Sequence, residues 1–420
     1  MEHGRVGGIR DRTSALPLTS VRGATRMLHV GVDATSWRND RGFGRFTREL
    51  VRALVARDTG FRYTLLFDQP PAEAMPAGVE VRSAGTRRTL TESAVGTTSR
   101  SAGYLWRIGW EARRAKADLF FFPALYSYFP ILTRLPCVVC YHDATGERLP
   151  DLVFPTKWNH RLWQLKTWLA RVQTTRAMTV SQTSATDLEQ ILHIPRERID
   201  VVTEAADPVF RVIDDPAVSA RARGRYDIPA DAELLVYVGG MNPHKNVLGL
   251  LEAMPAVMAE RPEVHLAIVG DTSGKGFADD VPKLKRFVTS MPLLEPRVHF
   301  TGYISDGELA ELLSAAVALV FPSLWEGFGL PAVEAMSCGV PVLASRRGSL
   351  PEVVGDAGLF FEPERPSAIA ECVLRFLRTP ELRPRLREMG LRRAQTFTWS
   401  RAAELAEACF RHCHQDAARR

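Results

Sequence analysis

The stretch ALVFPSLWEGFGLPAVEAMSCGVPVLAS, residues 318–345, contains one strand–helix–strand unit. Its apolar start at 318–323 predicts a buried strand, Pro331 suits the first turn of a helix that stops at Gly339, and residues 340–345 predict a second strand. The same alternation of apolar runs and amphipathic segments continues in both directions along the chain. We therefore predict an α/β fold with parallel sheets that carry helices on both faces.

The length and composition of the chain suit two such domains. The 420 residues are 45% hydrophobic and 24% charged, as in ordinary globular proteins, and a domain has roughly 150 residues. The predicted strands form two series, separated by a polar segment with three prolines. The predicted organisation is a disordered leader at 1–26, a doubly wound N-terminal domain at 27–206, a linker at 207–230, a doubly wound C-terminal domain at 231–397, and a helix at 398–420 that crosses back to the N-terminal domain.

Charge and composition exclude several classes of protein. The net charge is +6, and residues 1–210 have 29 basic and 21 acidic side chains, whereas residues 211–420 have 25 and 27. The basic residues do not cluster with a known nucleic-acid-binding module, so we expect no nucleic-acid partner. No apolar run is long enough for a transmembrane helix, and residues 1–26 lack the apolar core of a secretory signal. We expect a cytoplasmic protein, and a peripheral position at the inner face of the membrane is an open alternative.

The six cysteines do not form a disulfide framework, which also favours a reducing cytoplasm. Cys137 and Cys140 have Cys-x-x-Cys spacing, but they lie in a β-branched run that predicts a buried strand, where positions three apart face opposite sides. Cys409 and Cys413 share one face of the last helix, but no second group of ligands accompanies them. We therefore predict no metal site.

The most informative motif begins at Glu326 and ends at Glu334. Glycines between them let the backbone turn sharply, and the amides of Phe328, Gly329 and Leu330 then lie at the N-terminus of a helix, which favours an anion. Each carboxylate matches a vicinal diol, because its two oxygens can accept from two hydroxyls. A phosphate between two diols describes a sugar nucleotide. The alternative is that Glu334 is a charge in the first turn of a helix and Glu326 a solvated loop residue.

The E-x7-E element resembles the signature of retaining glycosyltransferase family four, which has the GT-B architecture of two facing Rossmann-like domains. Other matching segments are GVDAT…GFGRFTREL, VVCYHD, YVGGMNPHKN and the terminal FTWSRAAELA, and together they cover almost all of residues 28–412. The resemblance implies transfer of a sugar from a nucleotide-diphosphate sugar, such as GDP-mannose or a UDP-sugar, to a hydroxyl acceptor in polysaccharide or glycoconjugate biosynthesis. The acceptor is a glycan, a lipid-linked sugar or a small molecule. The Gly-Gly pair is similar to a branch that includes bacterial mannosyltransferases.

The resemblance also implies roles for individual residues. Glu334 is expected to bind the donor ribose, Glu326 to hold the transferred sugar, and Lys245 to pair with the pyrophosphate. The implied catalytic residues are His142, Glu326 and Lys245, and the implied donor-binding residues are Gly42, Gly44, Gly239, Gly240, Lys245, Phe328, Gly329, Leu330 and Glu334. Asp143 is a weaker candidate for contacting the acceptor.

One position departs from the family pattern. Many members have an arginine soon after the first glycine of the phosphate-binding loop, but this chain reads Gly239-Gly240-Met241. His244 or Arg346 is expected to compensate. The resemblance further implies retention of anomeric configuration without a side-chain nucleophile. It also implies no metal and no cofactor besides the co-substrate, since no Asp-x-Asp motif is evident.

Two sets of alternatives stay open. Five tryptophans at 106, 110, 158, 163 and 168 predict either a membrane-interface or sugar-stacking surface, or ordinary packing on the sheet. For function, the alternatives to a transferase are a nucleotide-sugar isomerase or epimerase of GT-B fold and a non-catalytic nucleotide-sugar-binding subunit.

Overall fold

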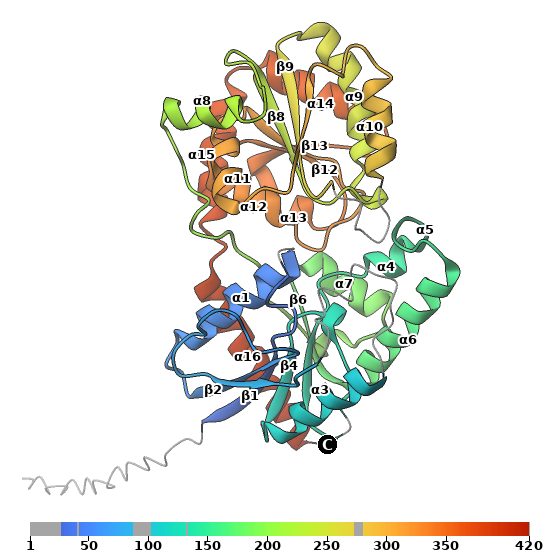
Figure 1. The fold of residues 1–420 in the computed structure, drawn as a ribbon, viewed down its shortest axis with the longest axis vertical. Helices are drawn as coiled ribbons and strands as arrows, with labels where there is room; N and C mark the ends of the chain where they lie inside the picture. The colour runs from blue at the N-terminus through green and yellow to red at the C-terminus, as the bar shows by residue number, and fades with distance from the viewer. Residues whose placement is uncertain (1–26, 40–41, 87–101, 132, 273–279, 420) are drawn as a thin grey trace, which may run out of the picture.

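The computed structural model describes residues 27–39, 42–86, 102–131, 133–272 and 280–419. The predicted leader at 1–26 lies outside them. The described residues form two parallel sheets, each covered by helices, and Figure 1 shows them as two lobes stacked along the long axis of the molecule. The predicted α/β class with two doubly wound sheets is confirmed.

Within the described residues, the first sheet has the strand order β3-β2-β1-β4-β5-β6-β7, and all of its pairs are parallel. The order reverses beside β1, as in other doubly wound sheets. Its strands are β1 (Leu28–Asp33), β2 (Phe61–Phe67), β3 (Glu80–Ser83), β4 (Leu119–Phe122), β5 (Cys137–Cys140), β6 (Thr174–Thr179) and β7 (Ile199–Val201). Its helices are α1 (Gly42–Val55), α3 (Ala102–Arg114), η1 (Leu125–Ser127), α4 (Thr145–Arg148), α5 (Pro150–Val153), α6 (Lys157–Gln173), α7 (Gln182–Gln190) and η2 (Arg196–Arg198).

Alternate side chains of this sheet enter two different hydrophobic cores. Phe121 packs with the core that includes α1, whereas Phe120 and Phe122 pack with the core that includes α3. In β5, Cys140 belongs to the first core and Cys137 to the second. The prediction that these two cysteines lie in a buried strand and face opposite sides is therefore confirmed.

Within the described residues, the second sheet has the order β10-β9-β8-β11-β12-β13 and is also parallel. Its strands are β8 (Glu233–Val238), β9 (Val264–Val269), β10 (Val298–Gly302), β11 (Ala318–Phe321), β12 (Val342–Ser345) and β13 (Gly358–Phe361). Its helices are η3 (Pro243–Lys245), α9 (Val247–Glu260), α10 (Val281–Thr289), α11 (Asp306–Ser314), α12 (Leu330–Ser337), α13 (Leu350–Val354), η4 (Gly355–Ala357), α14 (Pro366–Arg378) and α15 (Leu382–Ala394).

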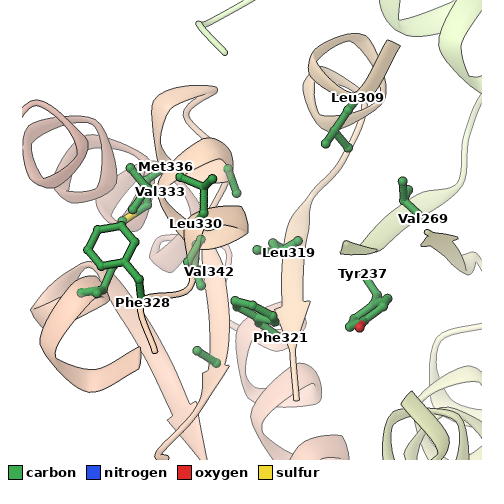
Figure 2. Close-up of a cluster of buried hydrophobic side chains, with 14 of the residues drawn as sticks. Tyr237, Val269, Leu309, Leu319, Phe321, Phe328, Leu330, Val333, Met336 and Val342 are labelled. Carbon is green, nitrogen blue, oxygen red and sulfur yellow. The ribbon is translucent and has the colours of Figure 1, made fainter. Parts of the chain in front are cut away.

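Local sequence signals explain several helix starts in this half. Ser305 and Glu308 form the predicted capping box at the start of α11. Pro331 lies in the first turn of α12, as predicted. Figure 2 shows Phe328 and Leu330, which flank the start of α12, among the buried side chains of this core. The loop that precedes α12 is therefore anchored in the core at both of these points.

Two segments connect the halves of the molecule. Helix α8 (Pro216–Gly224) lies within the segment 207–230 and packs against α11. Helix α16 (Trp399–Ala418) follows α15 and packs against α1 and the strands β4 to β7 of the first sheet. Figure 1 shows this passage of the chain from the upper lobe back into the lower one.

The glycine-rich segment after β1 differs from the predicted arrangement. Glycines favour turns, so the sequence predicts a turn at Gly42-Phe43-Gly44 and a helix only from Arg45, but α1 begins at Gly42 itself. Gly44 packs tightly, because a Cβ atom there would lie 1.9 Å from the carbonyl oxygen of Asn39. The position therefore lets α1 start directly against the loop that follows β1.

Candidate functional site

The loop between β11 and α12 joins the two glutamates of the E-x7-E element. Gly329 is the N-cap of α12 and has φ 97°, in the left-handed region that favours glycine. Ser349 holds the loop in place, because its Oγ donates to the carbonyl oxygens of Glu326 and Phe328 at 3.1 and 2.7 Å. Glu326 and Glu334 are both buried, so the alternative that Glu326 is a solvated loop residue is wrong.

The start of α12 leaves amide groups free. No part of the chain that the structure describes accepts a hydrogen bond from the N–H of Phe328, Gly329 or Leu330. Such N–H groups at a helix start, together with the helix dipole, favour an anion. The predicted anion-binding geometry is therefore present between the two carboxylates.

Glu326 meets Lys245, which lies 81 residues earlier in the chain. Lys245 Nζ donates to Glu326 Oε1 at 2.7 Å, and Ser323 Oγ donates to the same oxygen at 2.6 Å. Lys245 ends the short helix η3, which follows β8, so neighbouring parallel strands carry the two residues to one edge of the sheet. The cation is thus fixed beside the carboxylate that begins the loop with the free amides.

Glu334 meets Arg45 of α1, which sequence reasoning did not single out. Arg45 Nη1 donates to Glu334 Oε1, and Arg45 Nη2 donates to Asp306 Oδ1 at the start of α11. Burial raises the pKa of Glu334 to about 7, although the Arg45 guanidinium acts to lower it. No local pattern could have revealed this pair, because 289 residues separate its members.

His142 lies after β5 and uses both ring nitrogens. Nδ1 donates to Glu204 Oε1 at 3.0 Å and Nε2 to the carbonyl oxygen of Pro123 at 3.0 Å. Burial acts to lower the pKa of His142, but Cys140 and Glu204 outweigh it and raise the pKa well above its ordinary value. Because carboxylate and carbonyl oxygens only accept, this pair of partners fits an imidazolium that donates from both nitrogens. Glu204 is a second residue that sequence reasoning missed.

Backbone contacts bring the two halves together at Gly327. A Cβ atom at Gly327 would lie 2.2 Å from the carbonyl oxygen of His142. Ser181 Oγ and Ser184 Oγ, from the start of α7, donate to the carbonyl oxygen of Gly327 at 2.6 and 3.1 Å. The carboxyl ends of both sheets therefore face one another at the E-x7-E loop, which is where open α/β sheets bind ligands.

The remaining predicted glycines have different surroundings. At Gly239, which follows β8, a Cβ atom would lie 2.7 Å from the hydroxyl of Tyr237, and that hydroxyl donates to the carbonyl oxygen of Gly240 at 2.6 Å. Glycine at position 239 therefore leaves room for the Tyr237 hydroxyl at the end of β8, in the loop that leads to Lys245. Gly42 has open space around its Cα, whereas Gly44 packs on its own loop.

Neither residue expected to replace the missing arginine is placed as a free cation. Burial, with Lys245 as the next cause, lowers the pKa of His244 to about 4, so its ring is neutral at neutral pH. Arg346 is exposed, lies 3.8 Å from Glu362 and covers the ring of Phe360 at 5.6 Å. The arginine that does reach the site is Arg45.

Among the described residues, no three His, Cys, Asp or Glu side chains gather as a metal site. In the same part of the chain, no helix combines the length and the apolar character needed to cross a bilayer.

The fold and the site define a two-domain α/β protein with an anion-binding helix start between two buried carboxylates. Residues 41–209 match the family model described as Glycosyltransferase Family 4, and residues 218–393 match the one described as Glycosyl transferases group 1. The chain belongs to glycosyltransferase family 4 and has the GT-B architecture.

Curated relatives support this assignment. O-antigen chain mannosyltransferase B of Escherichia coli is 37% identical over 223 residues, 53% of this chain and 56% of that protein. MMP alpha-(1->4)-mannosyltransferase of Mycolicibacterium hassiacum is 31% identical over 282 residues, 64% of this chain and 63% of that protein. The chain thus spans less than two thirds of the length of each of these relatives.

Solved structures support the fold. Sucrose-phosphate synthase of Thermosynechococcus elongatus superimposes with a TM-score of 0.71 at 21% identity, over 92% of this chain and 98% of that one. HepE of Anabaena in complex with UDP-glucose has a TM-score of 0.69 at 20% identity, over 91% and 99%. At these identities the likeness shows the shared fold.

Proposed function

We propose that this protein is a retaining, metal-independent hexosyltransferase. It transfers a sugar from a nucleotide-diphosphate sugar to a hydroxyl acceptor in glycan biosynthesis, and it needs no cofactor besides this co-substrate. The observation that carries the proposal is the arrangement of Glu326, Lys245 and Glu334 around the free amides at the start of α12. GDP-mannose is the favoured donor, because two of the curated relatives are mannosyltransferases.

The arrangement suits the charges of such a donor. The free amides and Lys245 would hold the pyrophosphate, while Glu334 would accept hydrogen bonds from the ribose and Glu326 from the transferred sugar. As the bond between the anomeric carbon and the phosphate oxygen breaks, the leaving nucleoside diphosphate gains negative charge. A fixed cation and fixed N–H groups stabilise that charge more in the transition state than in the ground state.

The same pyrophosphate can complete the proton balance on the front face of the sugar. The acceptor oxygen bonds to the anomeric carbon on the side that the phosphate leaves, and its proton passes to the departing phosphate oxygen. Configuration is then retained, and no side-chain nucleophile is required. His142, which Glu204 holds at 3.0 Å, would contact the transferred sugar.

The direct test combines donors with variants. GDP-mannose, UDP-glucose and ADP-glucose are incubated with octyl α-mannoside, and nucleotide release and product anomers are measured with and without excess EDTA. We expect one donor to give an α-linked product at a rate that EDTA leaves unchanged. Glu326→Ala, Glu334→Ala and Lys245→Ala should each abolish most transfer, whereas Glu371→Ala on the exposed side of α14 should not.

Two outcomes would contradict the proposal. Unchanged turnover in all three site variants would remove these residues from the reaction. Conversion of the donor to another nucleotide sugar without acceptor would assign the protein to the isomerases. A rate that EDTA abolishes would overturn the metal-independent part alone.

The first half of the chain also carries an exposed aromatic surface. Trp106 and Trp110 of α3 are 60% and 47% exposed and stack with ring centroids 5.8 Å apart. Helix α6 exposes a stripe of apolar side chains at helical spacing: Trp158, Leu162, Leu165, Trp168 and Val172. Packing on the sheet is therefore wrong for four of the five tryptophans, and the half-buried Trp163, which donates to Glu147 at 2.8 Å, is the exception.

This α3–α6 surface is our candidate for peripheral membrane contact. Exposed basic residues, among them Arg107, Arg113 and Arg161, accompany the apolar ones, and this combination favours an anionic lipid interface. Low-salt cosedimentation with phosphatidylglycerol vesicles should retain the protein, and the double variant Trp158→Ser, Trp168→Ser should weaken retention. Met27→Ser, which removes an exposed apolar residue before β1, is the matched control. Absence of wild-type cosedimentation at low salt would contradict the proposal.

A further inference from the structure

Arg45 connects three parts of the molecule. It belongs to α1 of the first domain and pairs with Glu334 of α12 and Asp306 of α11 in the second. Its guanidinium covers the ring of Phe210 at 5.6 Å and is attracted by Asp207, and both residues lie in the segment that joins the domains. The Arg45 side chain is 14% exposed. An arginine fixed in this way responds to the relative position of the two domains.

Arg45 opposes the effect of the acidic groups around Glu334 on the ionisation of this carboxyl. Asp306 from α11, and Glu204 and Asp207 from the segment after β7, each act to raise the pKa of Glu334, as burial does more strongly. Arg45 is the strongest influence that favours the ionised form of this carboxyl. Without Arg45, Glu334 and Asp306 would lose the cation that pairs with both of them.

The ionisation of Glu334 decides how well it can bind a diol. An ionised carboxylate can accept about four hydrogen bonds, whereas a protonated one donates from one oxygen and accepts fewer. Arg45 takes one of these positions on Oε1 and leaves Oε2 without a donor from the described residues. The carboxylate therefore keeps acceptor capacity for two hydroxyls while Arg45 is bound.

We propose that Arg45 is a positioning residue for the nucleotide-sugar donor, and that it completes the ribose subsite from the opposite domain by holding Glu334 ionised and oriented. This inference rests on the proposed function, because it requires that Glu334 binds the donor. Arg45, the first residue after Gly42-Phe43-Gly44 in α1, thereby has a role in donor binding. Donor binding is thereby linked to contact between the domains, because the Arg45 guanidinium both orients Glu334 and connects the first domain to the second.

The test measures the affinity of the full chain for GDP-mannose, UDP-glucose and ADP-glucose by isothermal titration calorimetry between pH 6 and pH 9. Nucleotide sugars are used because, unlike a terminal phosphate with a pKa near 6, their phosphates do not titrate in this range. Wild-type affinity for the bound donor should rise with pH through about 7, where the Glu334 carboxyl ionises. Arg45→Met should move this transition upward by about one pH unit or more, which weakens binding about fivefold at pH 7.

Three further variants separate positioning from a structural role. Arg45→Lys should recover part of the affinity. Glu334→Gln should bind weakly but without the pH dependence, and adding Arg45→Met to it should cause little further loss, because the two residues act through one interaction. With saturating donor at pH 9, kcat of Arg45→Met should stay within about twofold of wild type, so the loss falls on donor affinity.

The outcomes distinguish this inference from the function on which it rests. If the wild type binds a donor but Arg45→Met binds it more tightly, Arg45 competes with the donor and the inference is overturned. An equal loss of affinity in the Glu334→Gln background would also overturn it, because Arg45 would then act elsewhere. If the wild type binds none of the three donors, the proposed function fails before any variant is compared.

Discussion

Lys245 and Glu326 form a 2.7 Å ion pair. The pair neutralises two partly buried charges of the second domain, and it keeps both side chains at the edge of the second sheet. A donor pyrophosphate would compete with Glu326 for Lys245, which frees the carboxylate to accept from the sugar. At the scale of single residues, Lys245 and Glu326 therefore keep each other in position, and under the proposed function both bind the donor.

Replacing Lys245 tests this reading at the same scale. Lys245→Met should lower kcat/KM by about 10²–10³, the loss seen when one fixed group that stabilises transition-state charge is removed. Lys245→Arg should retain more activity, because the charge stays. The measurement is the initial rate of nucleotide release, with Lys283→Met on the exposed side of α10 as the control. Equal loss in Lys283→Met would point to a general effect of surface charge.

At the scale of elements, the loop before α12 combines a rigid anchor with a close approach. Phe328 and Leu330 are buried in the second core, and Ser349 holds the loop carbonyls. On the other side, Gly327 touches the end of β5 so closely that no side chain fits. The second domain thus fixes the position of the loop, and the loop packs directly against the first domain.

Adding one methyl group at Gly327 should separate these elements. In Gly327→Ala the Cβ atom would overlap the carbonyl oxygen of His142, so the loop and the first domain must move apart. We expect kcat/KM to fall by more than about tenfold, because a displacement of about 1 Å can cost 10²-fold, while circular dichroism stays unchanged. Gly307→Ala in α11, where a Cβ atom meets nothing within 4 Å, is the matched control. Normal activity of Gly327→Ala would show that the close contact is dispensable.

At the scale of the whole molecule, α16 fastens the end of the chain to the first domain. Its Phe410 is fully buried and lies 5.1 Å from Phe121 of β4, measured between ring centroids. Arg176 of β6 pairs with Asp416 at 2.8 Å, so an apolar contact and an ion pair both hold the second half of the helix against the sheet. The two domains are consequently joined twice, by the segment after β7 and by the chain that leads into α16.

Truncating Phe410 should weaken this second connection. Phe410→Ala should lower the free energy of unfolding by about 3–5 kcal/mol, as for other buried aromatic residues. Urea denaturation followed by circular dichroism measures the change, and His414→Ala on the exposed face of α16 should stay within about 0.5 kcal/mol of wild type. Equal stability of the two variants would mean that α16 contributes little to folding.

Much of the fold could be predicted from local patterns. The central strands of both sheets are long apolar runs, and helix starts such as Ser305 and Pro331 carry their own signals. The edge strands β3 and β13 were not predicted, because β3 is polar and partly exposed, and β13 is apolar but only four residues long. The start of α1 was misplaced because glycine favours turns, whereas here it allows close packing.

The sequence by itself determined the two parallel sheets, the E-x7-E loop and the lysine that serves it, because each depends on residues close together in the chain or on strands that end at one edge. Only the tertiary structure decided which charges meet across the domains. Arg45 of the first domain lies 289 residues from Glu334 of the second. Such pairs leave no periodic or local signal, since they arise from how two separately folded sheets face one another.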